Sequence, residues 1–299
     1  MDYIRLSEGG GVYEIIAKCC GIESKTPILV AERPESPVRF VMVFHNHQPI
    51  HKYPPNGVYH GPWAFQHTWS PPEFYPLYDV GPYLLHARLV NRYRVSITYN
   101  LSPSLLWQWN DLINNGVFIE GKDSIEYMGP WDSRAVLIKE ALNTYSKLAS
   151  DGVIEVLTSF LAHPIAGYLI EKYGINELLR WELSMGKEIT KKVLGIKAIG
   201  MWLPELYFSE RLRDILCNEG IEYVVLDGVY HLGENIKDRG SLYRIYRHDC
   251  LAILFRDTAL SDLLSFQLNK ASNAQEADVN ARRLIIELMM RPTTPKTAP

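Results

Sequence analysis

Hydrophobic residues in this chain gather in short continuous runs that alternate with longer segments of helical periodicity. Six runs have the length and continuity of parallel strands that are buried on both faces. They are residues 38–47, 95–100, 152–158, 198–202, 222–226 and 250–255. Apolar residues at helical spacing predict helices over residues 83–93, 105–113, 133–150, 165–173, 175–193, 210–219 and 274–290. Strands and helices that alternate in this order indicate a parallel α/β fold.

The two ends of the chain do not follow this alternation. Residues 1–37 have the pattern of an N-terminal extension, with a piece of helical character from Val12 to Cys20. Residues 38–290 contain no linker, so we expect one parallel α/β domain with about six strand–helix units. The segment 291–299, RPTTPKTAP, has no apolar run, and we expect a disordered tail there rather than a strand.

Composition and charge narrow the classes of function. The 299 residues carry a net charge of −3, which gives no sign of a nucleic-acid or anionic membrane partner. No window reaches the ~18 apolar residues of a membrane span, and the N-terminus lacks a signal-peptide pattern. The four cysteines have no C-x-x-C spacing, so we expect no zinc site, no disulfide framework and a cytoplasmic location. Cys19 and Cys20 are expected to be small buried hydrophobes.

Polar residues that are suited to catalysis follow the predicted strands. In (β/α) barrels the carboxyl ends of the strands carry the active site. The residues that the sequence places there are His45, His47, Gln48, Glu155, His163, Trp202, Glu205, Asp227, Arg256 and Asp257. Trp63, in the long loop after the first strand, adds a flat apolar surface. Carboxylates, imidazoles and indole rings together suit acid–base or nucleophilic chemistry on a neutral polyol. No glycine-rich phosphate loop is present, so nucleotide chemistry has no support.

Several of these residues lie in motifs that resemble those of glycoside hydrolase family 57. His47-Gln48-Pro49 is similar to the first motif of that family. Residues 152–156, GVIEV, followed by His163-Pro164, are similar to the second motif. Residues 200–205, GMWLPE, resemble the W-x-P-E motif that carries the nucleophile. Residues 255–262, FRDTALSD, resemble the family's R-D-x-x-L-S-D stretch. The resemblance covers nearly the whole chain, and the loops are most similar to the α-amylase and amylopullulanase branch.

The resemblance implies a retaining glycoside hydrolase or glucanotransferase inside an incomplete (β/α)7 barrel. Its substrate would be an α-glucan such as starch, glycogen or a maltooligosaccharide. Glu205 would be the nucleophile that forms a covalent glycosyl-enzyme. The residues that would bind substrate are His47, Gln48, Trp63, Glu155, His163, Trp202, Asp227, Arg256 and Asp257. The family requires no metal, and no other cofactor is implied.

The resemblance ends before the seventh strand, where the family carries its acid/base aspartate. It therefore implies that this aspartate is absent from the 299 residues. Asp227 and Asp257 match other positions of the family pattern, so neither inherits the role. Loss of a general acid would remove a rate factor of ~10²–10⁴.

Three alternatives stay open at this point. The chain could be a glucan-binding fragment with impaired catalysis. It could be half of a split enzyme, in which a second polypeptide supplies the missing barrel strand. It could also be a metal-dependent polysaccharide deacetylase, for which His45-Asn46-His47 is the one candidate ligand set in the sequence. Glucan binding without turnover would indicate the binding fragment. Co-purification of a partner would indicate the split enzyme, and bound metal in the purified protein would indicate the deacetylase.

Overall fold

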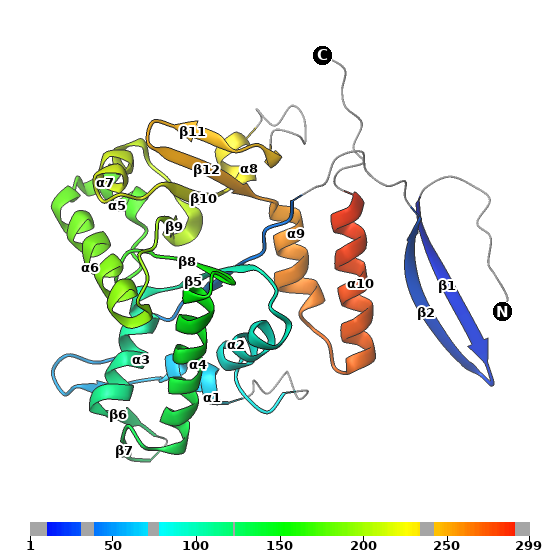
Figure 1. Cartoon of the computed structure of the whole chain (residues 1–299), viewed down its shortest axis with the longest axis horizontal. Coiled ribbons are helices and arrows are strands. Elements are labelled where there is room, and N and C mark those ends of the chain that lie inside the picture. Colours follow the sequence, from blue (N-terminus) through cyan, green and yellow to red (C-terminus); the bar gives the residue numbers. More distant parts are fainter. Residues whose placement is uncertain (1–10, 31–38, 71–77, 122, 234–241, 291–299) are drawn as a thin grey trace. The chain divides into compact units, whose positions relative to one another are not determined.

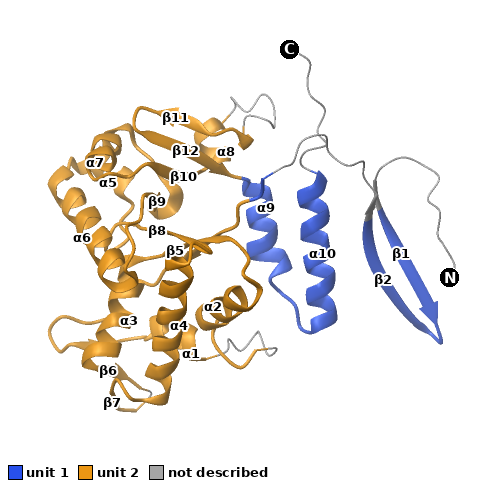
Figure 2. Ribbon diagram, in the orientation of Figure 1, with its two compact units in different colours: residues 1–40, 237–239, 257–299 blue, residues 41–236, 240–256 orange. Residues whose placement is uncertain are grey.

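A computed structural model describes residues 11–30, 39–70, 78–121, 123–233 and 242–290. The chain divides into two compact units, which Figure 2 distinguishes by colour. The larger unit comprises residues 41–236 and 240–256, and the smaller unit comprises residues 1–40, 237–239 and 257–299. The domain bounds expected from the sequence stay a prediction, and the expected disordered tail 291–299 lies outside the described residues.

Six parallel strands follow one another in chain order in the larger unit (Figure 1). They are β3 (Val43–Asn46), β5 (Ile97–Leu101), β8 (Ile154–Leu157), β9 (Gly200–Trp202), β10 (Tyr223–Asp227) and β12 (Leu251–Arg256). A bridge between Thr158 and Met201 continues the pairing from β8 to β9. The antiparallel strand β11 (Tyr246–His248) borders β12. All six predicted strands are confirmed, four with shorter bounds and two, β10 and β12, shifted by one residue, and so is the parallel α/β fold.

Within the described ranges no ladder joins β3 to β12, so the first and last parallel strands do not pair there. The incomplete seven-unit barrel therefore stays a prediction. A second, smaller sheet consists of β4 (Val58–Tyr59), β6 (Val117–Glu120) and β7 (Ile125–Met128). The sequence analysis missed these strands, although β6 alternates buried and exposed residues as a half-buried strand does.

Eight α-helices accompany the strands in the described part of the larger unit. They are α1 (Trp63–Trp69), α2 (Pro82–Tyr93), α3 (Pro103–Asn115), α4 (Ser133–Ser150), α5 (Ala166–Tyr173), α6 (Asn176–Leu194), α7 (Arg213–Asn218) and α8 (Gly228–Leu232). Ser102 caps α3 and Asp132 caps α4, each by accepting a backbone N–H hydrogen bond. The helices predicted from periodicity are confirmed here, and α4 has the predicted bounds. The predicted helix 210–219 begins as a 3₁₀ turn, Glu210–Leu212, before α7.

Two apolar clusters hold the larger unit together. In the first, the fully buried rings of Tyr99, Trp109 and Tyr145 join β5 to α3 and α4. In the second, Met201 of β9 and Val224 of β10 pack among residues of α5, α6 and α7. Helix packing on the sheet thus fixes the strands whose ends carry the candidate site. No helix in the described part of the chain is long and apolar enough to cross a membrane.

The smaller unit begins with a β-hairpin, where the sequence analysis predicted a helix over Val12–Cys20. That prediction is wrong, because β1 (Gly11–Cys19) pairs antiparallel with β2 (Ile22–Val30). The two residues between the strands, Cys20 and Gly21, have φ of 53° and 80°, which fits a tight hairpin turn. Cys19 and Cys20 are exposed at this turn, so the expectation that they are buried is also wrong.

Two helices and a π-helical turn complete the described part of the smaller unit. These are α9 (Thr258–Asp262), the turn Leu263–Leu268 and α10 (Ala274–Met290). Leu260, Leu263 and Leu268 pack with Leu284 and Leu288 of α10. The predicted helix 274–290 is confirmed with its predicted bounds.

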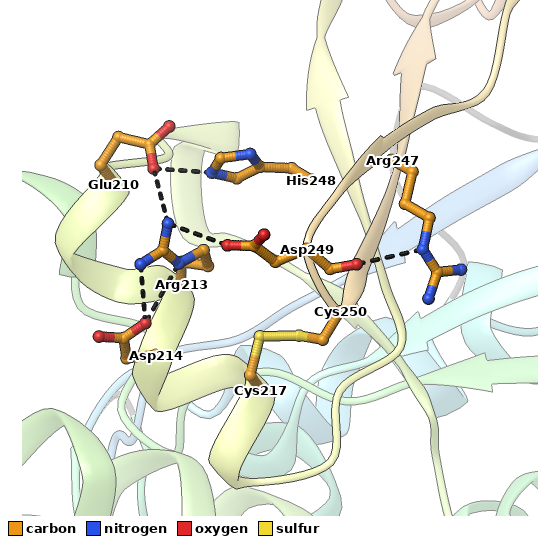
Figure 3. The surroundings of a disulfide bond; sticks show 8 residues. All are labelled: Glu210, Arg213, Asp214, Cys217, Arg247, His248, Asp249 and Cys250. Atoms are coloured by element: carbon orange, nitrogen blue, oxygen red, sulfur yellow. Dashed lines mark hydrogen bonds and ion pairs between the residues drawn. A yellow bond between two sulfur atoms is a disulfide. The ribbon is translucent and has the colours of Figure 1, made fainter.

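Cys217 and Cys250 form a disulfide that ties the end of α7 to the residue before β12 (Figure 3). The expectation of no disulfide framework is therefore wrong for this pair. Beside the bond, the guanidinium of Arg213 lies within ion-pair distance of Glu210, Asp214 and Asp249. A bond between residues 33 positions apart leaves no spacing signal in the sequence. The cysteines therefore no longer support the expected cytoplasmic location, which was inferred from the absence of disulfides.

We predict that replacing both Cys217 and Cys250 by serine lowers the free energy of unfolding by about 3–4 kcal/mol, because the unfolded chain loses a closed loop. Urea unfolding without reductant measures this difference. The matched control is Cys19→Ser, an exposed residue outside the disulfide, which should change stability by less than about 0.5 kcal/mol. Equal stability of the wild type with and without reductant would contradict the prediction.

Candidate functional site

One face of the parallel sheet collects the polar and aromatic residues that the sequence analysis selected. Side chains alternate between the two faces of a strand, and residues paired in a parallel register share a face. The register pairs His45 with Asn100, Asn100 with Leu157 and Asp227 with Arg256, and it is continuous through β9. The selected residues on this shared face are His45, His47, Glu155, Trp202, Asp227 and Arg256.

The rings of His45, His47, His163 and Trp202 form a stack, which we call the histidine–tryptophan stack. The ring centroid of His45 lies 4.5 Å from that of Trp202, with 11° between the planes. The centroids of His47 and His163 are 3.9 Å apart, and those of His45 and His163 are 4.9 Å apart. The stack therefore joins the end of β3, the loop after β8 and the end of β9.

Hydrogen bonds orient the histidines of the stack. Nδ1 of His45 lies 2.7 Å from Oδ1 of Asn100, whose Nδ2 donates to the carbonyls of Leu157 and Thr158. These two bonds orient the Asn100 amide, so Nδ1 of His45 is the donor and Nε2 is left as an acceptor. Nδ1 of His47 lies 3.0 Å from Oγ of Ser102. The sequence analysis missed these supporting residues, although each follows or ends a predicted strand.

Burial keeps the stacked histidines neutral. Desolvation lowers the pKa of His45 and of His47 to about 4, and the bond to Asn100 opposes the shift at His45. Desolvation first, and the neighbouring histidines second, lower the pKa of His163 to about 2. At neutral pH the stack is thus an uncharged set of hydrogen-bonding groups. Such a set suits hydroxyl groups better than anions.

Two buried nitrogens of the stack have no hydrogen-bond partner among the described residues. They are Nε1 of Trp202 and Nε2 of His163. Ser159, also missed by the sequence analysis, donates from Oγ to the backbone carbonyl of Trp202 at 2.9 Å and so holds the end of β9 in place. An unpaired buried N–H costs ~1–3 kcal/mol, so the arrangement is favourable only when water or a ligand pairs with these groups.

Glu205 lies immediately past β9, as the sequence analysis expected. It belongs to a single 3₁₀ turn, Pro204–Leu206, and its side chain is exposed. Glu205 and Leu206 have φ of 55° and 54°, in the left-handed region that is rare for residues with a side chain. Such backbone strain costs ~1–3 kcal/mol per residue and concentrates at functional sites. His163 has the same feature, with φ of 59°.

Arg256 is paired with Asp227. Nε of Arg256 donates to Oδ2 of Asp227 at 2.6 Å, and Oδ1 of Asp227 accepts from the backbone N–H of Tyr230. Asp227 is 2% exposed, so this pair joins β10, β12 and the start of α8 in a largely desolvated place. Asp257 belongs to the smaller unit, where it caps α9.

Glu155 lies on the same face as the stack but nearer the start of its strand. Tyr223 of β10 passes Gly200 of β9, where a Cβ atom would lie 2.1 Å from Cζ of the Tyr223 ring. Burial, and after it the Glu155 carboxylate, raises the pKa of the Tyr223 hydroxyl. Glycine at position 200 therefore lets this tyrosine reach across β9 towards Glu155. The sequence analysis missed Tyr223, because a tyrosine inside an apolar strand gives no separate signal.

Gln48 and Trp63 have other surroundings. Gln48 is buried, and its Nε2 donates to Oη of Tyr83 and to Nδ1 of His67. Trp63 begins α1 with about half of its side chain exposed, and its ring meets His51 edge-on at 5.4 Å. Gln48 thus ties the loop after β3 to α1 and α2, whereas Trp63 presents an open ring surface.

The deacetylase alternative requires metal ligands that converge on one point. His45 and His47 instead lie with nearly parallel, stacked rings, with 12° between their planes. Among the described residues, no group of three or more His, Cys, Asp or Glu side chains has a geometry that could hold a metal ion.

The sequence profile described as glycosyl hydrolase family 57 matches residues 41–291. No curated protein sequence matches the chain. Among solved structures, the fold is similar to a 4-α-glucanotransferase from Thermococcus litoralis, with a TM-score of 0.53 and 20% identity. It is also similar to an α-amylase from Thermotoga maritima, with a TM-score of 0.51 and 14% identity. These likenesses show the fold alone.

The two matches cover 86% and 77% of this chain, but 31% and 48% of the glucanotransferase and the amylase. The chain therefore spans about a third to a half of the length of these proteins.

We predict that stability falls as the pH drops from about 6.5 towards 4. The lowered pKa values of the stack mean that the unfolded chain binds protons in this range before the folded chain does. Urea midpoints at pH 7.5, 6 and 5 measure the effect. Asparagine tolerates positive φ and does not titrate. In His163→Asn, the folded and unfolded chains should therefore differ by about one bound proton fewer, and the slope of the unfolding free energy against pH should be smaller. An unchanged pH dependence in this variant would contradict the prediction.

Proposed function

The chain belongs to glycosyl hydrolase family 57, and we propose that it acts on α-glucans, such as starch, glycogen or maltooligosaccharides, as a retaining glycosidase or glucanotransferase. The observation that supports this proposal best is the neutral histidine–tryptophan stack, whose Trp202 precedes Glu205 by three residues. We also propose that its activity is of the α-amylase or amylopullulanase type. The cytoplasmic location also stays a prediction.

The stack supplies what a neutral sugar needs from its binding site. A glucosyl unit has hydroxyl groups that donate and accept hydrogen bonds, and it carries no charge. Nε2 of His45 is oriented as an acceptor, and Nε1 of Trp202 is a donor without a described protein partner. Because the imidazoles are neutral at pH 7, they pair with hydroxyl groups without attracting counter-ions. The four residues of the stack, His45, His47, His163 and Trp202, are therefore our proposed contacts for the glucosyl unit at the bond that is cleaved.

Glu205 is the proposed nucleophile. Its carboxylate would attack the anomeric carbon, the glycosidic bond would break, and a glycosyl-enzyme ester would form. Water or a second glucan would then take the glycosyl group and restore the carboxylate. Retention requires a second carboxyl group ~5–5.5 Å away to protonate the leaving oxygen. The family resemblance assigns this acid to none of the 299 residues, and Asp227 is unsuited to the role because it already pairs with Arg256 and caps α8.

Replacing Glu205 by glutamine is expected to lower product formation from maltooligosaccharides by about 10³-fold or more, because the amide cannot form the glycosyl ester. Chromatography of the products from maltoheptaose measures this loss. The matched control is Glu210→Gln, an exposed glutamate five residues further on, whose partners are His248 and Arg213. This control should keep the wild-type rate. Full activity of Glu205→Gln would contradict the assignment.

A wild-type chain that binds maltoheptaose without cleaving it would favour the second possibility that the sequence analysis raised. The general acid would then come from another polypeptide or from further sequence. Adding a candidate partner that carries the missing strand should restore cleavage, and Glu205→Gln should prevent the restoration.

A further inference from the structure

Neither the motifs nor the proposed mechanism uses two tyrosines at the start of α5 and after Glu205. Tyr207 follows Glu205 by two residues, and Tyr168 is in the first turn of α5. Tyr207 is 40% exposed and Tyr168 is 43% exposed. Tyr168 follows Gly167 in the sequence, and a Cβ atom at Gly167 would meet the ring of Tyr207. We call these two residues the tyrosine pair.

The ring of Tyr207 packs against Gly167, which has no side chain. A Cβ atom at Gly167 would lie 2.4 Å from Cδ1 and 3.0 Å from Cε1 of Tyr207, distances that real Cβ atoms do not reach or reach only rarely. One side of the ring therefore lies directly against the backbone of α5. Any other residue at position 167 would displace the ring. The close approach fixes Tyr207 in place even though much of it stays exposed.

Charged residues of α5 hold both phenol groups. The Tyr207 hydroxyl donates to Oε2 of Glu171 at 3.2 Å, and Nζ of Lys172 donates to the Tyr168 hydroxyl at 2.7 Å. The bond to Glu171 raises the pKa of Tyr207, so the hydroxyl stays protonated. Each ring is thus anchored at its polar end and exposed over part of its surface. Anchored aromatic rings lose little conformational entropy when a ligand packs on them.

We propose that the tyrosine pair forms a subsite for glucosyl units beyond the bond that Glu205 attacks. The inference rests on the proposed function, because it takes the α-glucan chain as the ligand. The apolar C–H surface of a glucosyl ring packs on an aromatic ring. The hydroxyl groups of the same unit meet Glu171 and Lys172, whose charges suit hydrogen bonding to a polyol. The pair gives the site a preference for long glucan chains over short ones.

The test compares the binding of maltotriose and maltoheptaose by titration calorimetry, in the Glu205→Gln background so that no substrate is consumed. Tyr207→Ala should weaken maltoheptaose binding about tenfold and leave maltotriose binding within about twofold, because a short ligand does not reach the pair. Tyr207→Phe keeps the ring, so it should keep most of the affinity for maltoheptaose. The matched control is Tyr173→Ala, an exposed tyrosine at the other end of α5, which should bind both ligands normally.

Three outcomes separate this inference from the proposed function. Unchanged binding of maltoheptaose by Tyr207→Ala, or equal weakening of both ligands, overturns the subsite and leaves the proposed function standing. No binding of either ligand by the Glu205→Gln parent and by the wild type contradicts the proposed function, and the subsite fails with it. If Tyr207→Ala does not fold, Tyr168→Ala takes its place, because that side chain is not seated on Gly167. It must show the same contrast between long and short ligands.

Discussion

The register of the parallel strands, which places paired residues on the same face of the sheet, is the constraint on which the rest of this molecule depends. Because the register is continuous from β3 to β12, side chains that are 150 or more residues apart in the sequence share one face. A slip of one residue in β9 would turn Trp202 away and bring Met201, which is fully buried, to the polar face. The helices that cover the other face make such a slip costly. The same packing that stabilises the sheet therefore assembles the candidate site.

Burial of the histidines has two linked consequences. It keeps them uncharged over the pH range in which most proteins work, and this makes the stack a hydrogen-bonding surface for neutral hydroxyl groups. It also lowers the free energy of unfolding at acidic pH, because the histidines bind protons in the unfolded chain at a higher pH than in the folded chain. Asn100, Ser102 and Ser159 reduce the cost of burying the histidines, because their side chains form hydrogen bonds with His45, His47 and His163 respectively. Recognition and acid sensitivity thus have one physical origin.

The strands and most helices could be predicted because their signals are local. An apolar run of strand length, or an apolar stripe at helical spacing such as that of α4, needs no knowledge of the rest of the chain. The residues of the stack were selected in the same way, because they follow or end predicted strands, and the role of Glu205 stays a prediction. Partners could not be predicted, because the pairing of Arg256 with Asp227 and of Cys217 with Cys250 depends on which strands become neighbours. The prediction of a helix over Val12–Cys20 is wrong because β1 is stabilised by pairing with β2. The pattern of apolar residues within β1 contains no information about this pairing.

Glu205 combines an exposed carboxylate with a strained backbone, and its neighbours explain how this combination persists. Leu206, with the same left-handed φ, is 4% exposed and is held by a backbone bond to Leu203. On the other side, β9 ends in Trp202, whose ring is fixed by the stack. Strain of this kind survives only where the surroundings determine the backbone more strongly than the residue itself does. Glu205 is thus positioned by buried residues on both sides, and its own side chain stays free for chemistry.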